Sequence, residues 1–213
     1  HYNGENGMFF INDDSADLTE ELGNINLLEV PPLDPWEYIT NDLSFAPGTN
    51  NTASNEQQQQ LLRAWVLQIF FGNTLPTRPL LLFVGPRGSG KTTAARRLLR
   101  FIEGTGQDVL GIVNDKEDSL RASIQSHLVL VLDNIEKTRV HWLDNILNRL
   151  ATGAQLELRN LYKTNEKYVI KPDCFVMLTG INVPSQEEAL YSRILPLEMS
   201  PLGTTYPEQI MQS

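Results

Sequence analysis

The sequence is poor in cysteine and in long apolar runs. Its 213 residues include a single cysteine, Cys174, which excludes a disulfide framework and fits a reducing compartment. The longest apolar runs, near residues 79–84 and 128–132, have the length of strands and are too short to cross a bilayer. We therefore expect a cytoplasmic globular protein with no membrane partner. Residue 1 is His and no basic and apolar leader follows it, so we expect a fragment or a processed chain.

Basic side chains are absent from the first part of the chain. The first 62 residues hold 11 acidic residues and no Lys or Arg, whereas residues 63–213 hold 15 acidic and 17 basic residues. The net charge of -9 therefore comes from the N-terminal part. This balance argues against nonspecific nucleic-acid binding by the whole surface, and it leaves room for a local basic groove.

The chain is long enough for one substantial core and a small appendage. Residues 1–30 alternate short apolar pieces with acidic and Asn- and Gly-rich stretches, as expected for part of a missing neighbouring domain. After a double proline, residues 31–76 are predicted to be helical, with one helix that starts at Pro35 and another over 57–71, where apolar residues recur at helical spacing. Residues 77–213 are expected to form an α/β core.

The most informative stretch begins with the apolar run 79–84, which predicts a strand buried on both faces. The next eight residues, GPRGSGKT, match the phosphate-binding pattern G-x-x-x-x-G-K-[ST] and are called the glycine loop here. A predicted helix follows from Thr93. Strand, loop and helix therefore come in the order that a nucleoside triphosphate site requires.

The residue types of the glycine loop fit phosphate chemistry. Its glycines let the backbone N–H groups converge on an anion, and the helix N-terminus adds partial positive charge. We expect Lys91 to reach the β and γ phosphates and the Thr92 hydroxyl to hold magnesium. The residues expected to contact the nucleotide are Gly85, Pro86, Arg87, Gly88, Ser89, Gly90, Lys91, Thr92 and Thr93. The alternative is an ordinary surface glycine turn.

A second apolar run, over 127–132, ends in Asp133. After a phosphate loop this is the Walker B arrangement, in which the carboxylate holds magnesium through water. Many hydrolytic relatives place a Glu directly after that Asp to polarise the attacking water, but this chain has Asn134. Glu136 could substitute for it, or could be a solvated turn residue. The sequence therefore supports nucleotide binding more directly than hydrolysis.

Three later residues are candidates to sense the γ phosphate or to complete the site. The apolar strand predicted over 174–179 ends in Thr179, which we take as the sensor of the γ phosphate; Asn182 is the alternative, and a plain strand-end threonine is the other interpretation. In the segment 192–197, Arg193 stands just before the last predicted strand. It is either an arginine finger donated in trans to a neighbouring subunit or a structural residue at the sheet edge.

A predicted hairpin pairs residues 155–162 with 167–170. Its basic residues Arg159, Lys163 and Lys167 could hold the phosphates of a nucleic-acid strand, or could simply be solubilising side chains. The remaining predicted elements are a strand over 108–113, helices over 116–124 and 137–152, and a short helix or turn over 184–191.

Several of these stretches together resemble a known family. GPRGSGKT, LVLVLDN, LATGAQLELRNLYKTNE, FVMLTGIN and ALYSRILPLEM are similar to the ATPase domains of phage and plasmid primase-helicases, which are related to superfamily 3 helicases of the AAA+ group. The resemblance spans roughly residues 27–200. The short tail after the last strand leaves no room for the C-terminal helical lid of most AAA+ ATPases, which also favours the superfamily 3 branch.

The resemblance implies an AAA+-like P-loop NTPase fold, with a five-stranded parallel sheet between helices and a small helical region ahead of it. It also implies ATP and Mg2+ as cofactors and self-association into a hexameric ring. The ring would move along single-stranded or forked DNA in replication or on a mobile element. Two departures stand out: Asn134 replaces the usual second acid, and TGIN differs from the family pattern in which an Asn ends the sensor strand.

Three functions remain open from the sequence. The leading one is a replicative DNA helicase ATPase, a motor driven by ATP hydrolysis. The second is a nucleotide-gated AAA+ switch or scaffold with slow or absent hydrolysis, which Asn134 favours. The third, a small-molecule kinase, is disfavoured because no Arg-rich lid for the phosphates follows Lys116.

Overall fold

The structure is a computed structural model. It describes residues 35–40, 43–71, 77–104, 108, 110–111, 117–135, 141–159, 167–170, 172–183 and 188–201. The predicted acidic segment 1–30 and the candidate residues Glu136 and Lys163 lie outside these described residues.

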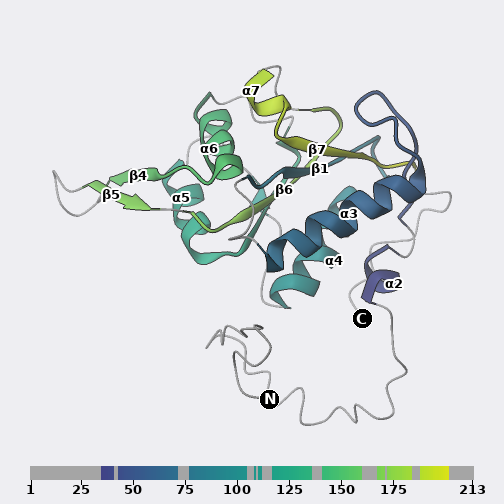
Figure 1. The fold of residues 1–213 in the computed structure, drawn as a ribbon, viewed down its shortest axis with the longest axis horizontal. Helices are drawn as coiled ribbons and strands as arrows, with labels where there is room; N and C mark the ends of the chain where they lie inside the picture. Colours follow the sequence, from purple (N-terminus) through teal and green to yellow (C-terminus); the bar gives the residue numbers. More distant parts are fainter. Residues whose placement is uncertain are drawn as a thin grey trace, which may run out of the picture.

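A parallel sheet between two layers of helices forms the centre of the molecule (Figure 1). Its order is β2-β3-β6-β1-β7, and all four pairings are parallel. The four full strands are β1 (Leu80–Val84), β3 (Val129–Asp133), β6 (Phe175–Gly180) and β7 (Ile194–Glu198). The two-residue β2 (Leu110–Gly111) pairs with β3 at one edge. The predicted α/β class is confirmed, and the predicted count of five strands is reached only by including this short pairing.

One face of the sheet is covered by α2 (Pro35–Thr40), α3 (Asn55–Phe70) and α4 (Lys91–Glu103). The start of α3 is fixed by a capping box, in which Ser54 and Gln57 bond each other's backbone N–H groups. Apolar residues of these helices share one core with alternate strand residues, which point to the same face. The predicted helical region therefore packs directly on the sheet, while the predicted division at residue 76 stays a prediction.

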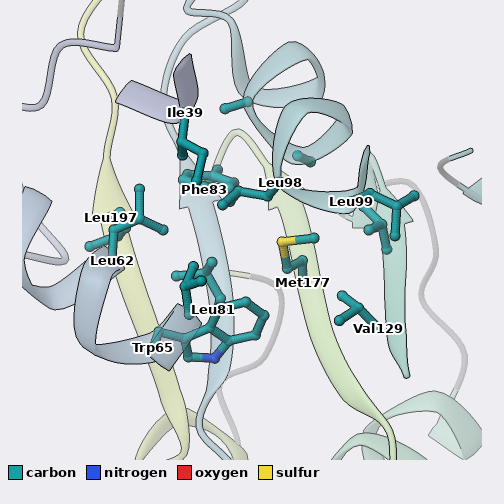
Figure 2. Packing of buried hydrophobic residues seen from close by; sticks show 14 of the residues in the cluster. Ile39, Leu62, Trp65, Leu81, Phe83, Leu98, Leu99, Val129, Met177 and Leu197 are labelled. Carbon is teal, nitrogen blue, oxygen red and sulfur yellow. The ribbon is translucent and has the colours of Figure 1, made fainter. Parts of the chain in front are cut away.

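Figure 2 shows this core at close range. Trp65 of α3 lies beside Leu81 of β1, and Leu98 of α4 lies near Phe83. The Trp65 ring meets Phe175 edge to face at 6.2 Å, and its indole N–H donates to the carbonyl of Pro79 at 2.7 Å. The buried ring thus satisfies its polar atom as it ties α3 to β1 and β6.

One residue of the predicted apolar face of α3 is not buried. Phe70 belongs to the apolar residues that recur at helical spacing over 57–71, yet it is 64% exposed. Ile69 is the last residue of α3 in the core, and Phe70, the last residue of the helix, lies outside that core.

The opposite face is covered by α5 (Glu117–Ser126), α6 (His141–Thr152) and α7 (Glu188–Tyr191). These helices pack on the other alternate set of strand residues. Because both faces are covered, the strands are nearly continuous apolar runs, and β1 is buried at all five positions. This is why the apolar runs in the sequence predicted the central strands well.

The outer edge of β7 is covered by residues 43–51. Phe45 bridges to Met199 in antiparallel fashion, and Asn51 donates its side-chain amide to the carbonyl of Pro196 at 2.7 Å. Pro196 has no N–H to offer, which suits a position on the outer side of an edge strand. The wrapping segment therefore leaves little open edge for pairing with another chain.

The predicted hairpin is confirmed. Strands β4 (Leu156–Arg159) and β5 (Lys167–Ile170) pair antiparallel, with Arg159 opposite Lys167. They form a two-stranded sheet of their own, and Figure 1 shows it extending away from the central sheet beyond α5 and α6.

Candidate functional site

The glycine loop connects the carboxyl end of β1 to the first turn of α4. Lys91 is the first residue of α4, and Gly90 is its N-cap with no side-chain bond to the first turn. The first N–H groups of the helix are therefore not capped by a side chain and face the region of the loop. In an α/β fold, the carboxyl edge of a parallel sheet is the usual place for a ligand.

Gly85 sits against the end of β7. It has a φ of 157°, and a Cβ at this position would lie 2.5 Å from the backbone oxygen of Met199. Its N–H donates to the carbonyl of Gly180 at 3.3 Å. Only a glycine fits where the first turn of the loop touches both neighbouring strands.

The Lys91 side chain lies inside the glycine loop. Its ammonium donates to the carbonyl oxygens of Gly85 at 2.9 Å and Pro86 at 2.7 Å, and the residue is only 9% exposed. Ser89 is also buried, and its hydroxyl lies 3.4 Å from the same ammonium. A buried cation is therefore held among the loop's carbonyls, at the centre of the predicted phosphate site.

Asp133 lies at the end of β3, next to the start of α4. Its Oδ1 accepts a hydrogen bond from the Thr92 hydroxyl at 2.9 Å and one from the Thr179 hydroxyl at 2.5 Å. The three residues are far apart in sequence, but their strands and helix all reach the same edge of the sheet. The structure thus brings together the two predicted magnesium residues and one predicted sensor.

Asn134 completes this cluster. It has a φ of 55°, in the left-handed region that Asn tolerates better than most residues. Its side-chain amide donates to Oδ2 of Asp133 at 2.8 Å, and its backbone N–H donates to the Thr179 hydroxyl at 3.0 Å. Sequence reasoning had treated Asn134 only as a missing acid. That Asn tolerates the left-handed region is a local indication of the turn, but it does not predict the hydrogen bond from Asn134 to Asp133.

The donor set suits magnesium. A hard cation of this kind is typically held by one or two carboxylates together with phosphate oxygens and water, and Asp133 and Thr92 supply one carboxylate and one hydroxyl in direct contact. Among the described residues, no group of three or more His, Cys, Asp or Glu side chains could hold a metal by itself. A metal here would depend on the phosphates for its other ligands.

The other predicted loop residues take different positions. Pro86, Arg87 and Gly88 are exposed, while Thr93 is half-buried on α4. Asn182, the alternative sensor, is exposed in the bend that follows β6. The loop therefore has an open outer side and a buried inner side that carries Ser89 and Lys91.

Arg193 lies at the other end of the sheet. Its carbonyl accepts a hydrogen bond from the N–H of Leu80, the first residue of β1. At about 3.3 Å per residue, the length of β1 separates it from the glycine loop by roughly 13 Å. Its guanidinium donates to the Asn148 side chain at 3.3 Å and to the carbonyl of Ala189. Within one chain it does not join Lys91 and Asp133.

The hairpin residues are placed only through their backbone. Arg159 and Lys167 are paired across β4 and β5. Lys163 and Glu136 lie outside the described residues, so their predicted roles stay predictions. No helix in the described part of the chain is long and apolar enough to span a membrane.

Comparison with known proteins gives a family and a fold. Residues 48–204 match the model of a family described as "Actinomycete integrative conjugative element replication protein". No curated protein sequence gives a significant match. The matched segment contains the glycine loop, Asp133, the hairpin and Arg193.

Similar solved structures come from the C-terminal region of NrS-1. The apo structure of its region 305–718 gives a TM-score of 0.54 at 17% identity, and covers 84% of this chain and 42% of that chain. An A form apo structure of the same region gives 0.54 at 18% identity, with 84% and 41% covered. The similarity shows a shared fold, and the chain spans less than half the length of these structures.

Proposed function

The chain belongs to the family of actinomycete integrative conjugative element replication proteins, and from this premise we propose that it is the ATPase motor part of a DNA replication protein. More specifically, we propose a replicative DNA helicase ATPase that hydrolyses ATP as a ring, most simply a hexamer. As part of this proposal, its α/β fold is assigned to AAA+-like P-loop NTPases. The family supports the replication role, and the site geometry supports the ATPase.

One observation carries the ATPase proposal. Thr92 and Asp133 are 41 positions apart in sequence, yet the hydroxyl of one donates to the carboxylate of the other at 2.9 Å. These are the two residues that phosphate-loop enzymes use to hold magnesium. Their contact at the first turn of α4, beside a buried lysine, supports a site for a triphosphate with its metal.

The residues of the loop then have defined tasks. The N–H groups of the loop and of the first turn of α4 bind phosphate oxygens. Lys91 exchanges the carbonyls of Gly85 and Pro86 for the β and γ phosphates. Magnesium, when bound beside Thr92 and Asp133, neutralises charge that develops on the phosphate oxygens.

Hydrolysis needs groups that the described site does not contain. Glu136 is the candidate to orient the attacking water, and Arg193 is the candidate to reach the nucleotide of a neighbouring subunit. The position of Arg193, remote from its own glycine loop, favours donation in trans over donation within the chain. Ring formation therefore follows from the proposed role of this arginine.

The β4–β5 hairpin is the proposed contact with DNA. It carries Arg159 and Lys167 opposite each other and Lys163 between the strands. Because it extends away from the sheet (Figure 1), it can reach a strand in the middle of a ring and hold its phosphates.

The experiment is ATP hydrolysis with and without single-stranded DNA. The motor predicts strong stimulation by DNA, and Lys91→Ala is expected to abolish both basal and stimulated hydrolysis. Arg100→Ala is the matched control, because it removes one positive charge from an exposed position of the same helix. Normal turnover by Lys91→Ala would show that another protein is responsible.

A second function is favoured by one observation. Position 134 is an asparagine, which has no carboxylate to activate water, and its side-chain amide donates a hydrogen bond to Asp133. A nucleotide-gated switch or scaffold in replication, with slow hydrolysis, would use the site in this state. ATP-dependent assembly with little stimulation by single-stranded DNA would select the switch over the motor.

A further inference from the structure

The environment of Thr179 distinguishes between the two candidate sensors. Thr179 is fully buried, with 0% of its surface exposed, whereas Asn182 is exposed three residues later in the chain. We infer that Thr179 is a positioning residue that holds the metal carboxylate Asp133, and that it does not contact the γ phosphate. This inference rests on the proposed nucleotide site.

The hydrogen bonds of the Thr179 hydroxyl carry the inference. A hydroxyl has one proton to donate, and Thr179 donates it to Oδ1 of Asp133 at 2.5 Å. The oxygen of the Thr179 hydroxyl in turn accepts a hydrogen bond from the backbone N–H of Asn134 at 3.0 Å. A phosphate oxygen accepts hydrogen bonds and has none to donate, so Thr179 could serve it only by releasing Asp133. Asn182 is exposed, and among the described residues no hydrogen bond holds its side-chain amide, so it stays the candidate sensor.

The backbone around Thr179 makes it a rigid support. It lies in β6 between β1 and β3, paired with Phe83 of β1. Its bond to the Asn134 N–H also fixes the turn that aims the Asn134 amide at Oδ2 of Asp133. Thr179 and Asn134 therefore hold one carboxylate oxygen each. When Thr92 turns toward the metal, these two residues keep Asp133 in place.

Residues that orient a metal ligand typically change metal affinity 10- to 100-fold when they are removed. Thr179→Val keeps the shape of the side chain and removes the hydroxyl. We expect it to raise the magnesium concentration needed for half-maximal binding of a fluorescent ATP analogue by about 10- to 100-fold. Thr179→Ser restores the hydroxyl and is expected to behave like the unaltered protein.

Two further variants separate positioning from sensing. Asn134→Gly keeps the left-handed backbone and removes the amide that holds Oδ2, so we expect it also to raise the magnesium requirement. Asn182→Ala is expected to leave that requirement unchanged and to reduce the preference for the ATP analogue over the corresponding ADP analogue. If Asn182→Ala shifts the magnesium requirement and Thr179→Val does not, the assignment of roles is overturned.

Amide hydrogen exchange tests the same bond without any ligand. The Asn134 N–H is expected to exchange faster in Thr179→Val than in Thr179→Ser, because only serine keeps its acceptor. Thr179→Ala replaces the valine variant in both measurements if the latter does not fold. An unchanged magnesium requirement and unchanged exchange would refute the inference. Failure of the unaltered protein to bind the ATP analogue at any magnesium concentration would instead refute the proposed function.

Discussion

Replacing Gly85 by alanine tests the fit between the glycine loop and the sheet. The added Cβ would lie 2.5 Å from the backbone oxygen of Met199, on a residue whose φ is 157°. Met199 is 3% exposed, and its N–H bonds the carbonyl of Val84 at 2.7 Å, so neither side can move freely. Crowding of a packed site costs about 1–3 kcal/mol, and the unfavourable φ adds roughly 1 kcal/mol. Gly85→Ala should therefore destabilise the fold by about 2–4 kcal/mol.

Urea and thermal unfolding give the assay, and Gly88→Ala gives the matched control. Gly88 lies in the same loop with a φ of 78°, but a Cβ there would meet nothing within 4 Å. It should therefore cost only the backbone strain, about 1–2 kcal/mol. For a chain of this length each kcal/mol corresponds to about 2–4 °C in Tm, so Gly85→Ala should have the lower Tm, by about 2–4 °C for each kcal/mol that separates the two variants. If Gly88→Ala destabilises the protein as much as Gly85→Ala, the close contact between Gly85 and Met199 is not what requires a glycine.

Three further predictions concern other parts of the molecule. Gln58 is 0% exposed and bonds Ala46, Ala53 and Glu198. In denaturant titrations, Gln58→Ala should therefore lower the free energy of unfolding by about 1–3 kcal/mol. Replacing the exposed Gln60 by alanine should change it by less than about 0.5 kcal/mol, and equal effects of the two variants would contradict the prediction. Burial raises the pKa of the Cys174 thiol from 9.0 to about 12, so at pH 8 only about one thiol in 10⁴ is ionised. A thiol reagent should therefore label Cys174 only after unfolding, and rapid labelling of the folded protein would be inconsistent with its burial. Arg193→Ala should reduce ATP turnover by about 10³- to 10⁵-fold and leave nucleotide affinity unchanged. Mixing Arg193→Ala subunits with Lys91→Ala subunits should restore part of the hydrolysis. Unaltered turnover by Arg193→Ala would exclude its role as an arginine finger.

Much of the fold was predictable because the central strands are buried on both faces. The apolar runs at 79–84 and 128–132 correspond to β1 and β3, since a parallel sheet covered by helices leaves no polar side to its strands. The hairpin was also predictable, because turn residues act locally. Apolar spacing predicted the helix over 57–71, although α3 begins at Asn55, after a capping box at Ser54 that was not predicted. These features depend on neighbours in the sequence, which a pattern can report.

The contacts that join distant segments were not predictable. Gln58 bonds the backbone of Glu198 across 140 positions, and nothing in a run of glutamines indicates which one is buried. Helical spacing likewise gives one face of α3 but not which of its residues meets the sheet, and Phe70 is exposed. Long-range packing decides both cases.

In the candidate site, too, the features that depend on sequence neighbours were predictable and the contacts between distant segments were not. The glycine loop and Asp133 were predictable because strand, loop and helix follow one another in the chain. The contacts of Thr179 and Asn134 were not, because they depend on β3 and β6 lying side by side and on one residue with positive φ. A missing acid in the sequence proved to be a donor to the carboxylate beside it.

The most direct test is a crystal structure with a non-hydrolysable ATP analogue and magnesium. The account predicts that the triphosphate lies along the glycine loop, that the Lys91 ammonium leaves the carbonyls of Gly85 and Pro86 for the phosphates, and that the metal contacts Thr92 beside Asp133. A nucleotide bound elsewhere, with Lys91 still bonded to those carbonyls, would contradict it.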